Sequence, residues 1–216
     1  MKITEIRVPQ YEKVVRVEDK ASELKAFISV HSTNLGPGLG GIRMWNYMSE
    51  EAALTDVLHL SRAMSYKAAG SQMRLGGGKA VIWGDPKTDK HPELFQVMGE
   101  AIESLKGKYI GTEDAGISVD DIEIVATRTK YITGLKKGSG DPSIATGRGV
   151  YYGIQEAVRS KLRRNTLEDI RILVQGVGHV GTQLIPYLMK DGAKVTVTDI
   201  MPEKIEGAVK TFGVEA

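Results

Sequence analysis

A glycine-rich turn between two β-branched segments limits the folds open to this chain more than anything else in its sequence. Residues 170–175 (IRILVQ) and 193–199 (AKVTVTD) are each short and apolar, which predicts two strands. Residues 179–190 lie between them and 201–213 follow, and both segments carry apolar residues at helical spacing. Strands that alternate with helices predict a parallel, right-handed βαβ arrangement of the Rossmann type.

The turn itself has the pattern G-x-G-x-x-G directly after the first strand. The first glycine permits a tight turn, the second lets the backbone approach a pyrophosphate, and the third lets helix and strand pack closely. Asp199 ends the next strand, where a carboxylate accepts a hydrogen bond from a ribose 2′-hydroxyl and repels a 2′-phosphate, which favours NAD over NADP. The alternative is a plain strand–turn–helix with a capping aspartate. The predicted cofactor-binding residues of the turn are Gly176, Val177, Gly178, His179, Val180 and Gly181.

The chain before this unit mixes strands and helices, so we expect an α/β domain with a mixed sheet. A composition rich in Gly, Lys and Pro at residues 131–143 predicts a hinge. The predicted domains are residues 1–135, for substrate and assembly, and residues 136–216, a partial dinucleotide-binding domain. Strands are predicted at 13–19, 24–32, 79–84 and 107–114, helices at 50–67, 91–105, 118–128 and 144–162, and a loop at 34–41 (NLGPGLGG).

Composition removes several classes of function. A net charge of +2 with both signs interspersed gives no reason to expect nucleic acid or a membrane as partner. The chain has no cysteine, and its four histidines lack metal-ligand spacing, so no metal site is predicted. Neither a signal peptide nor a membrane-spanning run is present, so we expect a soluble, cytoplasmic protein.

Two lysines and an aspartate form the candidate catalytic group. Lys79 follows three glycines and opens an apolar strand, and Lys67 continues a helical stripe through Leu60 and Met64. A buried lysine beside a second cation has a lowered pKa, which suits a general base. We therefore expect Lys67 to share a buried cleft with Lys79, and Asp114 to be the third member. The alternatives are a lysine that reaches water past the helix end, a strand-edge lysine and a turn aspartate.

Several segments together resemble the glutamate, leucine, phenylalanine and valine dehydrogenase family, and most of all its leucine dehydrogenase branch. The resemblance runs from about residue 14 to the last residue. It rests on the segments HSTNLGPGLGGIRMW, EEAALTDVLHLSRAMSYKAA, LGGGKAVIWGDPKTDK, ATGRGV and VQGVGHVGTQL.

The resemblance implies NAD-dependent oxidative deamination of an amino acid to a 2-oxo acid and ammonia. It implies that Lys79 is the base that activates water, that Asp114 exchanges a proton with the amine, and that Lys67 binds the substrate carboxylate. It also implies a homo-oligomer. The remaining implied contacts are Leu39, Gly40, Met64 and Thr112 for the substrate and Thr146 for the nicotinamide.

Three positions bear on the substrate and cofactor. Glutamate dehydrogenases carry a lysine where this chain has Leu39, so a second substrate carboxylate would stay unpaired and an apolar side chain is favoured. Thr112 stands where the leucine branch usually has alanine, which would shrink the pocket toward valine. Asp141 replaces an expected asparagine, which puts its cofactor contact in doubt.

A full doubly wound domain has two mononucleotide-binding halves, and only two of its strands are predicted here. Family members continue for more than a hundred further residues, so little activity is expected of this polypeptide alone. The alternatives are a fragment of a longer enzyme, a chain completed by another polypeptide, and a non-catalytic assembly subunit. A tetrahydrofolate-type dehydrogenase is a further alternative, which LGGGKAV does not support.

Overall fold

The computed structural model describes residues 1–138 and 141–216, and they form two compact units, Met1–Gly140 and Asp141–Ala216. The predicted hinge at residues 131–143 includes Ser139 and Gly140, which lie outside the described residues. The unit boundary falls five residues after the predicted domain boundary. The roles predicted for the two domains stay predictions.

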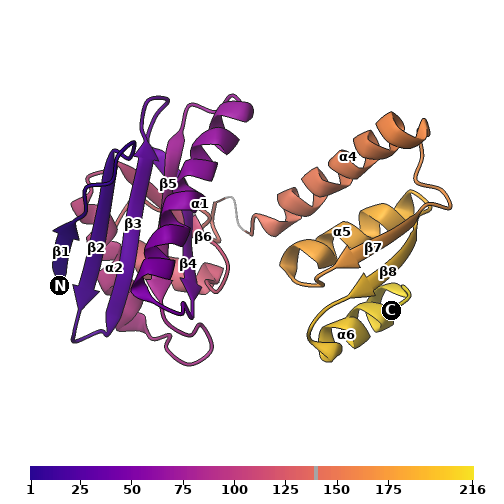
Figure 1. Cartoon of the computed structure of the whole chain (residues 1–216). Helices are drawn as coiled ribbons and strands as arrows, with labels where there is room; N and C mark the ends of the chain where they lie inside the picture. Colours follow the sequence, from indigo (N-terminus) through magenta and orange to yellow (C-terminus); the bar gives the residue numbers. More distant parts are fainter. Residues whose placement is uncertain (139–140) are drawn as a thin grey trace. The chain divides into compact units, whose positions relative to one another are not determined.

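The first unit is built on a mixed six-stranded sheet, as expected. The strands are β1 (Lys2–Glu5), β2 (Lys13–Asp19), β3 (Leu24–Ser32), β4 (Gly38–Trp45), β5 (Gly76–Trp83) and β6 (Tyr109–Glu113). Their order in the sheet is β1-β2-β3-β5-β4-β6 (Figure 1). Pairs β1–β2, β2–β3 and β3–β5 are antiparallel, whereas β4 runs parallel to β5 and β6. The carboxyl ends of β4 and β6 therefore lie at the same end of the sheet.

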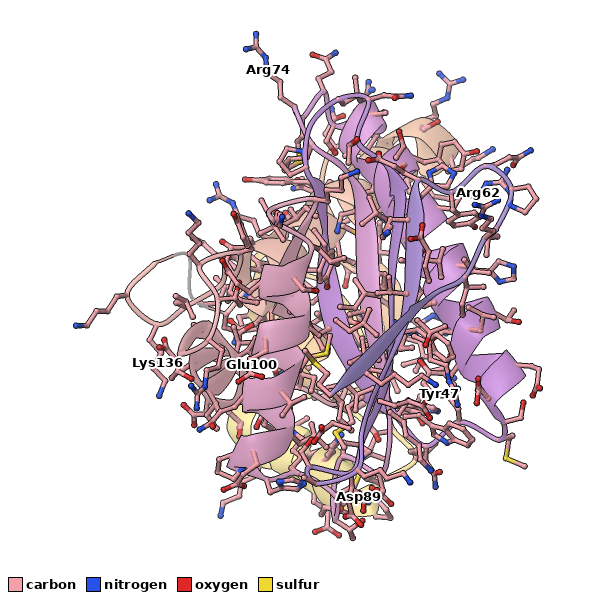
Figure 2. The ribbon with its side chains drawn as sticks, turned by 90° about the vertical axis from the view of Figure 1, so that its left-hand side faces the viewer. Tyr47, Arg62, Arg74, Asp89, Glu100 and Lys136 are labelled. Carbon is pink, nitrogen blue, oxygen red and sulfur yellow. The ribbon has the colours of Figure 1, made fainter. Side chains whose placement is uncertain are left out.

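Helices cover both faces of this sheet, as the view along its edge shows (Figure 2). The helices are α1 (Glu50–Gly70), α2 (Pro92–Ser104) and α3 (Val119–Ala126). On one face, Ala53 and Val57 of α1 pack on Phe27 and Val81 of the sheet. On the other face, α2 and α3 enclose the larger core, whose members include Ile28, Ile42, Ile82, Phe95, Met98 and Ile122.

Local signals explain where these helices begin. The hydroxyl of Ser49 accepts a hydrogen bond from the amide of Ala52 at the start of α1. Pro92 is the first residue of α2, a position that has no need of its missing N–H. Ser118 and Asp121 form the predicted capping box at the start of α3. All three helices were expected near these positions.

The sequence prediction was wrong about the glycine-rich segments. Residues 38–41 were predicted as loop, but they begin β4, which lies between β5 and β6. Strand β5 begins at Gly76 and not at Lys79. The edge strand β1, whose side chains are all exposed, was not predicted. Glycine is unfavourable in a strand on average, but close contacts with neighbouring elements override that preference here.

The second unit contains α4 (Ser143–Leu162), β7 (Arg171–Gln175), α5 (His179–Lys190), β8 (Lys194–Thr198) and α6 (Pro202–Phe212). Strands β7 and β8 pair in parallel, as predicted, and form a two-stranded sheet (Figure 1). A separate core holds this unit together, with Val174, Ile185, Leu188 and Val197 among its buried members. The fold class is thus the expected one: a mixed α/β unit followed by an incomplete Rossmann-like unit. In the described parts of the chain, no helix combines the length and the apolar character that crossing a membrane requires.

Candidate functional site

Lys79 occupies a buried position in the middle of β5, with only 5% of its surface exposed. Its ammonium nitrogen Nζ lies 2.9 Å from Oδ2 of Asp114, the residue that directly follows β6. A side chain at Gly41 would stand between the two groups, because a Cβ there would lie 2.5 Å from Cβ of Asp114 and 3.2 Å from Nζ of Lys79. The absence of a side chain on β4 therefore lets the lysine and the carboxylate meet.

Arg43 binds the same oxygen from the other side. Its Nε donates to Oδ2 of Asp114 over 2.8 Å, and its Nη1 donates to Oδ2 of Asp56 on α1 over 3.0 Å. The hydroxyl of Tyr47 donates to that Asp56 oxygen over 2.6 Å. A continuous chain of contacts thus links Lys79, Asp114, Arg43, Asp56 and Tyr47, which we call the charge network.

Burial and charge act in opposite directions on the two central groups. Burial lowers the pKa of Lys79, the positive charge of Arg43 lowers it further, and Asp114 opposes both. Burial alone would raise the pKa of Asp114, but Lys79 and Arg43 outweigh it and hold that pKa below the ordinary value. The site thus combines an ionised carboxylate with a lysine that gives up its proton more readily than a lysine in water.

The second cation of the site is Arg43 and not Lys67. Lys67 lies in the last turn of α1 and is exposed, so the expected buried cleft shared by two lysines is absent. The buried residues of α1 are Ala53, Val57, Ser61 and Ala68, and the line through Met64 to Lys67 runs along the margin of that face. A role of Lys67 in binding a substrate carboxylate stays a prediction, since an exposed ammonium group is accessible to an incoming anion.

The three glycines before Lys79 were interpreted as room for something that approaches the backbone. The structure shows that parts of this protein approach there. A Cβ at Gly77 would lie 2.3 Å from the backbone nitrogen of Ser65 on α1. A Cβ at Gly78 would lie 2.6 Å from the ring of Tyr109. Gly77 and Gly78 thus allow α1 and Tyr109 to pack closely against the two faces of β5, the strand that carries Lys79.

The other predicted substrate residues lie on β4, β6 and α1. Leu39 and Thr112 are half-buried on β4 and β6, and Thr112 is the register partner of Gly41. Met64 is half-buried on α1. The carbonyl of Gly40 accepts a hydrogen bond from the Tyr109 hydroxyl over 2.8 Å, and Tyr109 is fully buried. The Gly40 carbonyl thus has a partner within the protein, and a contact between Gly40 and a substrate stays a prediction.

The backbone of the predicted cofactor turn is shaped by its glycines. Gly176 adopts φ +93°, which favours glycine, and a Cβ at Gly181 would lie 2.1 Å from the carbonyl oxygen of Gly176. Gly178 caps α5 without a side-chain hydrogen bond, and a Cβ there would meet no atom within 4 Å among the described residues. Open space beside the amino end of a helix fits an anionic phosphate group.

Asp199 already has partners within the protein. Its Oδ2 accepts from the amide of Val177 over 2.8 Å, and its Oδ1 accepts from the amide of Met201 over 3.0 Å. These bonds, first of all the one from Val177, lower the pKa of Asp199 and keep it ionised. They tie the end of β8 to the glycine turn. The hydroxyl of Thr146 donates to the carbonyl of Pro142 within its own helix.

Sequence reasoning missed Arg43, Asp56, Tyr47 and Gly41. Arg43 follows the glycines of LGGIR and alternates in phase with Leu39 along β4, which was a usable signal once that segment is recognised as a strand. Nothing in the sequence alone pairs Asp56 on a helix with Arg43 on a strand. No cluster of His, Asp and Glu suited to a metal ion occurs within residues 1–138 and 141–216.

Two family profiles match the chain. One is described as "Glu/Leu/Phe/Val dehydrogenase, dimerisation domain" and covers residues 6–134. The other is described as "Glutamate/Leucine/Phenylalanine/Valine dehydrogenase" and covers residues 138–201. Together they span both compact units.

Individual relatives agree with these profiles. The leucine dehydrogenase of Thermoactinomyces intermedius is 47% identical over 208 residues, which are 95% of this chain and 57% of that protein. The phenylalanine dehydrogenase of Caldalkalibacillus thermarum is 42% identical, over 94% of this chain and 56% of that protein. The crystal structure of L-tryptophan dehydrogenase from Nostoc punctiforme matches with a TM-score of 0.68 at 37% identity, and the match covers 95% of this chain and 58% of that one. The chain thus spans somewhat more than half the length of these relatives.

Proposed function

The chain belongs to the Glu/Leu/Phe/Val dehydrogenase family, and on that basis we propose that it carries out the oxidative deamination of an apolar L-amino acid with NAD. The observation that carries the proposal is the buried Lys79 in contact with Asp114. Burial lowers the pKa of Lys79, which favours the role of a general base, and a partly exposed carboxylate beside it can exchange protons with an amine.

The proposed steps use these two side chains in turn. NAD, held at the turn of Gly176, Gly178 and Gly181, would supply the acceptor for the hydride that leaves the substrate α-carbon, and the substrate would become an imine. Neutral Lys79 then takes a proton from a water molecule while the water oxygen bonds to the imine carbon. Asp114, which took a proton from the substrate ammonium group before hydride transfer, returns that proton to the substrate nitrogen. Lys79 releases its proton to water and takes the hydroxyl proton of the carbinolamine as the carbon–nitrogen bond breaks, and ammonia and the 2-oxo acid leave. Lys67 is proposed to hold the substrate carboxylate.

The proposed substrate has an apolar side chain of leucine or valine size. Arg43 is already engaged by two carboxylates, and Leu39 is apolar, so a second substrate carboxylate would find no free cation there. Burying an unpaired carboxylate costs several kcal/mol. The hydroxyl of Thr112 packs against Gly134, where a Cβ would come within 2.6 Å of it. Relatives named for leucine, phenylalanine and tryptophan support an apolar substrate.

NAD is the proposed cofactor, held by the glycine turn at Gly176, Gly178 and Gly181. The open space beside Gly178 and the uncapped start of α5 support a bound pyrophosphate. Asp199 supports NAD over NADP, because its carboxylate would repel a 2′-phosphate. A homo-oligomer assembled through the first unit is proposed from the profile described as a dimerisation domain, and a cytoplasmic location stays a prediction. Native mass spectrometry of the purified protein tests the assembly.

The experiment that tests the function is a substrate panel on the complete polypeptide that carries this sequence. NADH formation is followed with L-leucine, L-valine, L-phenylalanine and L-glutamate, and the 2-oxo acid product is identified by mass spectrometry. We expect turnover with the apolar substrates and at least about a hundredfold lower kcat/KM with glutamate, the equivalent of about 2.7 kcal/mol. Lys79→Ala should reduce kcat by about 10²–10⁴-fold with an unchanged circular dichroism spectrum.

Two outcomes would contradict this proposal. Equal activity of Lys79→Ala and the parent protein would remove Lys79 from the chemistry. A folded protein that binds no NAD and turns over none of the four amino acids would favour the alternative of a non-catalytic assembly subunit.

A further inference from the structure

Arg43 is unusual among the charged residues of the site because its guanidinium is held from two directions. Nε contacts Asp114 beyond β6, and Nη1 contacts Asp56 on α1. A guanidinium group is a rigid planar fork, so two carboxylates on different elements fix its position and its orientation. Arg43 itself lies on β4, between β5 and β6 in the sheet. It therefore connects three elements at the point where the catalytic pair lies.

The contacts of Asp114 are distributed unevenly between its two oxygens. Oδ2 receives both Lys79 Nζ and Arg43 Nε, at 2.9 Å and 2.8 Å. Oδ1 has no hydrogen-bond partner among the described residues. No fully buried side-chain oxygen or nitrogen of those residues lacks a partner, so Oδ1 is open to solvent. One oxygen is thus occupied by the protein, and the other has no partner among the described residues and is not fully buried.

We propose that Arg43 and Asp56 are positioning residues, with Asp56 holding Arg43 so that Arg43 presents Oδ1 of Asp114 to the substrate amine. The inference rests on the proposed function, because it assigns the geometry that function needs. Tyr47 supports the arrangement from the other end, since its hydroxyl fixes Asp56. Burial and the bond to Asp56 raise the pKa of Tyr47, so this hydroxyl keeps its proton and remains a donor.

The charged groups that face Lys79 come from three elements. They are Asp114 after β6, Arg43 on β4 and Asp56 on α1. Removal of Arg43 takes one of two cations away from Asp114, so the pKa of Asp114 rises. Removal of the Asp56 charge takes an anion away from Lys79 and frees Arg43, so the pKa of Lys79 falls. The two variants are therefore expected to shift the pKa values of two different groups in opposite directions.

The test compares Arg43→Gln, Arg43→Lys and Asp56→Asn in the complete polypeptide. The pKa of Asp114 and of Lys79 are followed by carbon-13 NMR, with the signals assigned from Asp114→Asn and Lys79→Met. We expect the pKa of Asp114 to rise in Arg43→Gln and the pKa of Lys79 to fall in Asp56→Asn. With substrate, Arg43→Gln should lower kcat about 10–100-fold and change KM much less, because a small misplacement of a catalytic group has an effect of this size.

Arg43→Lys separates position from charge. A lysine keeps the positive charge but cannot bridge two carboxylates as a planar fork does. We expect its kcat to stay at least about tenfold below that of the parent protein. Full recovery of activity in Arg43→Lys, or unchanged pKa values in Arg43→Gln and Asp56→Asn, would overturn the proposal. The NMR titrations need no turnover, so they test the network even if the dehydrogenase function itself fails.

Matched controls and a milder variant keep the result interpretable. Arg74→Gln and Glu100→Gln remove one charge each at exposed positions, on the loop after α1 and on α2 (Figure 2), and should change neither pKa nor kcat. If Asp56→Asn does not fold, Tyr47→Phe removes only the hydroxyl that fixes Asp56. It should lower kcat in the same direction by a smaller factor, and a kcat equal to that of the parent would count against the proposal.

Discussion

Asp114 is the residue on which the proposed chemistry depends, because it holds two cations with a single oxygen. Its carboxylate offsets the cost of burying the charged form of Lys79 and keeps one oxygen free. A buried ion pair of this kind contributes little net stability, but loss of one partner leaves the other uncompensated. The stability of the first unit should therefore respond to Asp114 in a pH-dependent way.

The first prediction concerns Asp114→Asn. The folded-state pKa of Asp114 is lowered, so its stabilising contribution is complete above the unfolded value of about 3.9 and disappears as pH falls through the folded value. At pH 7 the variant should be less stable than the parent by on the order of 1–3 kcal/mol. The difference should shrink at pH 3 and below, as measured by urea unfolding at each pH. A difference that is constant across this range would contradict the assignment.

A second prediction at this scale concerns Asp199. Its carboxylate accepts hydrogen bonds from two backbone amides. In the proposed complex it would also face the ribose, and its charge would then influence the choice of cofactor as well. Asp199→Asn should weaken NAD binding about tenfold. It should also reduce or reverse the ratio of the affinity for NAD to the affinity for NADP, because the repulsion of a 2′-phosphate is removed. Calorimetric titration with both cofactors measures this. Glu203→Gln, an exposed residue in the first turn of α6, is the matched control.

Single residues also show how far sequence reasoning reaches. Lys79 and Asp114 were predicted as partners from residue type and context, and their contact confirms that they lie together. Lys67 was expected beside them, but it is exposed. The helical spacing of Leu60, Met64 and Lys67 predicts that they share one face of the helix, and it does not predict how deeply that face is buried. The second cation of the site is Arg43. It was missed because residues 34–41 were predicted as a loop, so the alternation of side chains along β4 was not considered.

At the scale of elements, the contact between α1 and β5 sets the position of Lys79. It depends on Gly77, where a Cβ would lie 2.2–2.3 Å from atoms of Ser61 and Ser65, two of which belong to the backbone. No change of rotamer can relieve such a contact, so the helix itself has to move. Packing of the whole helix thus depends on one position of the strand.

The third prediction tests this contact. Gly77→Ala should lower the free energy of unfolding by about 1–3 kcal/mol, as expected for overpacking, and should reduce kcat by displacing Lys79. Gly70→Ala is the matched control, because a Cβ at Gly70 meets no described atom within 4 Å. It should be neutral or stabilising by up to about 1 kcal/mol. Equal effects of the two variants in urea unfolding would contradict the role of Gly77.

Elements with a local cause were predicted well. Helices α1, α2 and α3 begin at Ser, Pro and capping-box signals that act within a few residues. The parallel pair β7–β8 followed from the alternation of strands and helices around a glycine turn. Strand β4 and the beginning of β5 were missed because their glycines are explained only by distant partners such as Ser65 and Tyr109. The exposed edge strand β1 has no apolar face to mark it.

At the scale of the whole molecule, the two units have separate cores, and the first is the larger. A ligand that binds one unit stabilises that unit first. Amide hydrogen exchange measures local opening along the chain, so it would report which unit is stabilised by the proposed cofactor NAD.

The fourth prediction follows from this separation. Saturating NAD should slow amide exchange at residues 176–182 and leave β3 and β5 unchanged, as measured by mass spectrometry. Gly178→Ala should fold as the parent does, because its Cβ meets no described atom, yet lose most of this protection, since the methyl group takes the space of the pyrophosphate. Protection that is equal in the variant and the parent would contradict a phosphate site at this turn.

The close packing of glycine backbone around Lys79 also affects how the substrate specificity of the protein could be engineered. Glycines 40, 41, 77 and 78 each face a neighbour at a distance that excludes a methyl group, so randomising them in a mutant library would yield mostly misfolded clones. Leu39 and Thr112 are half-buried neighbours that already carry side chains, so a substitution there exchanges one side chain for another and does not insert a methyl group against backbone. Directed evolution toward bulkier or polar amino acids should therefore begin at these two codons and leave the glycines untouched.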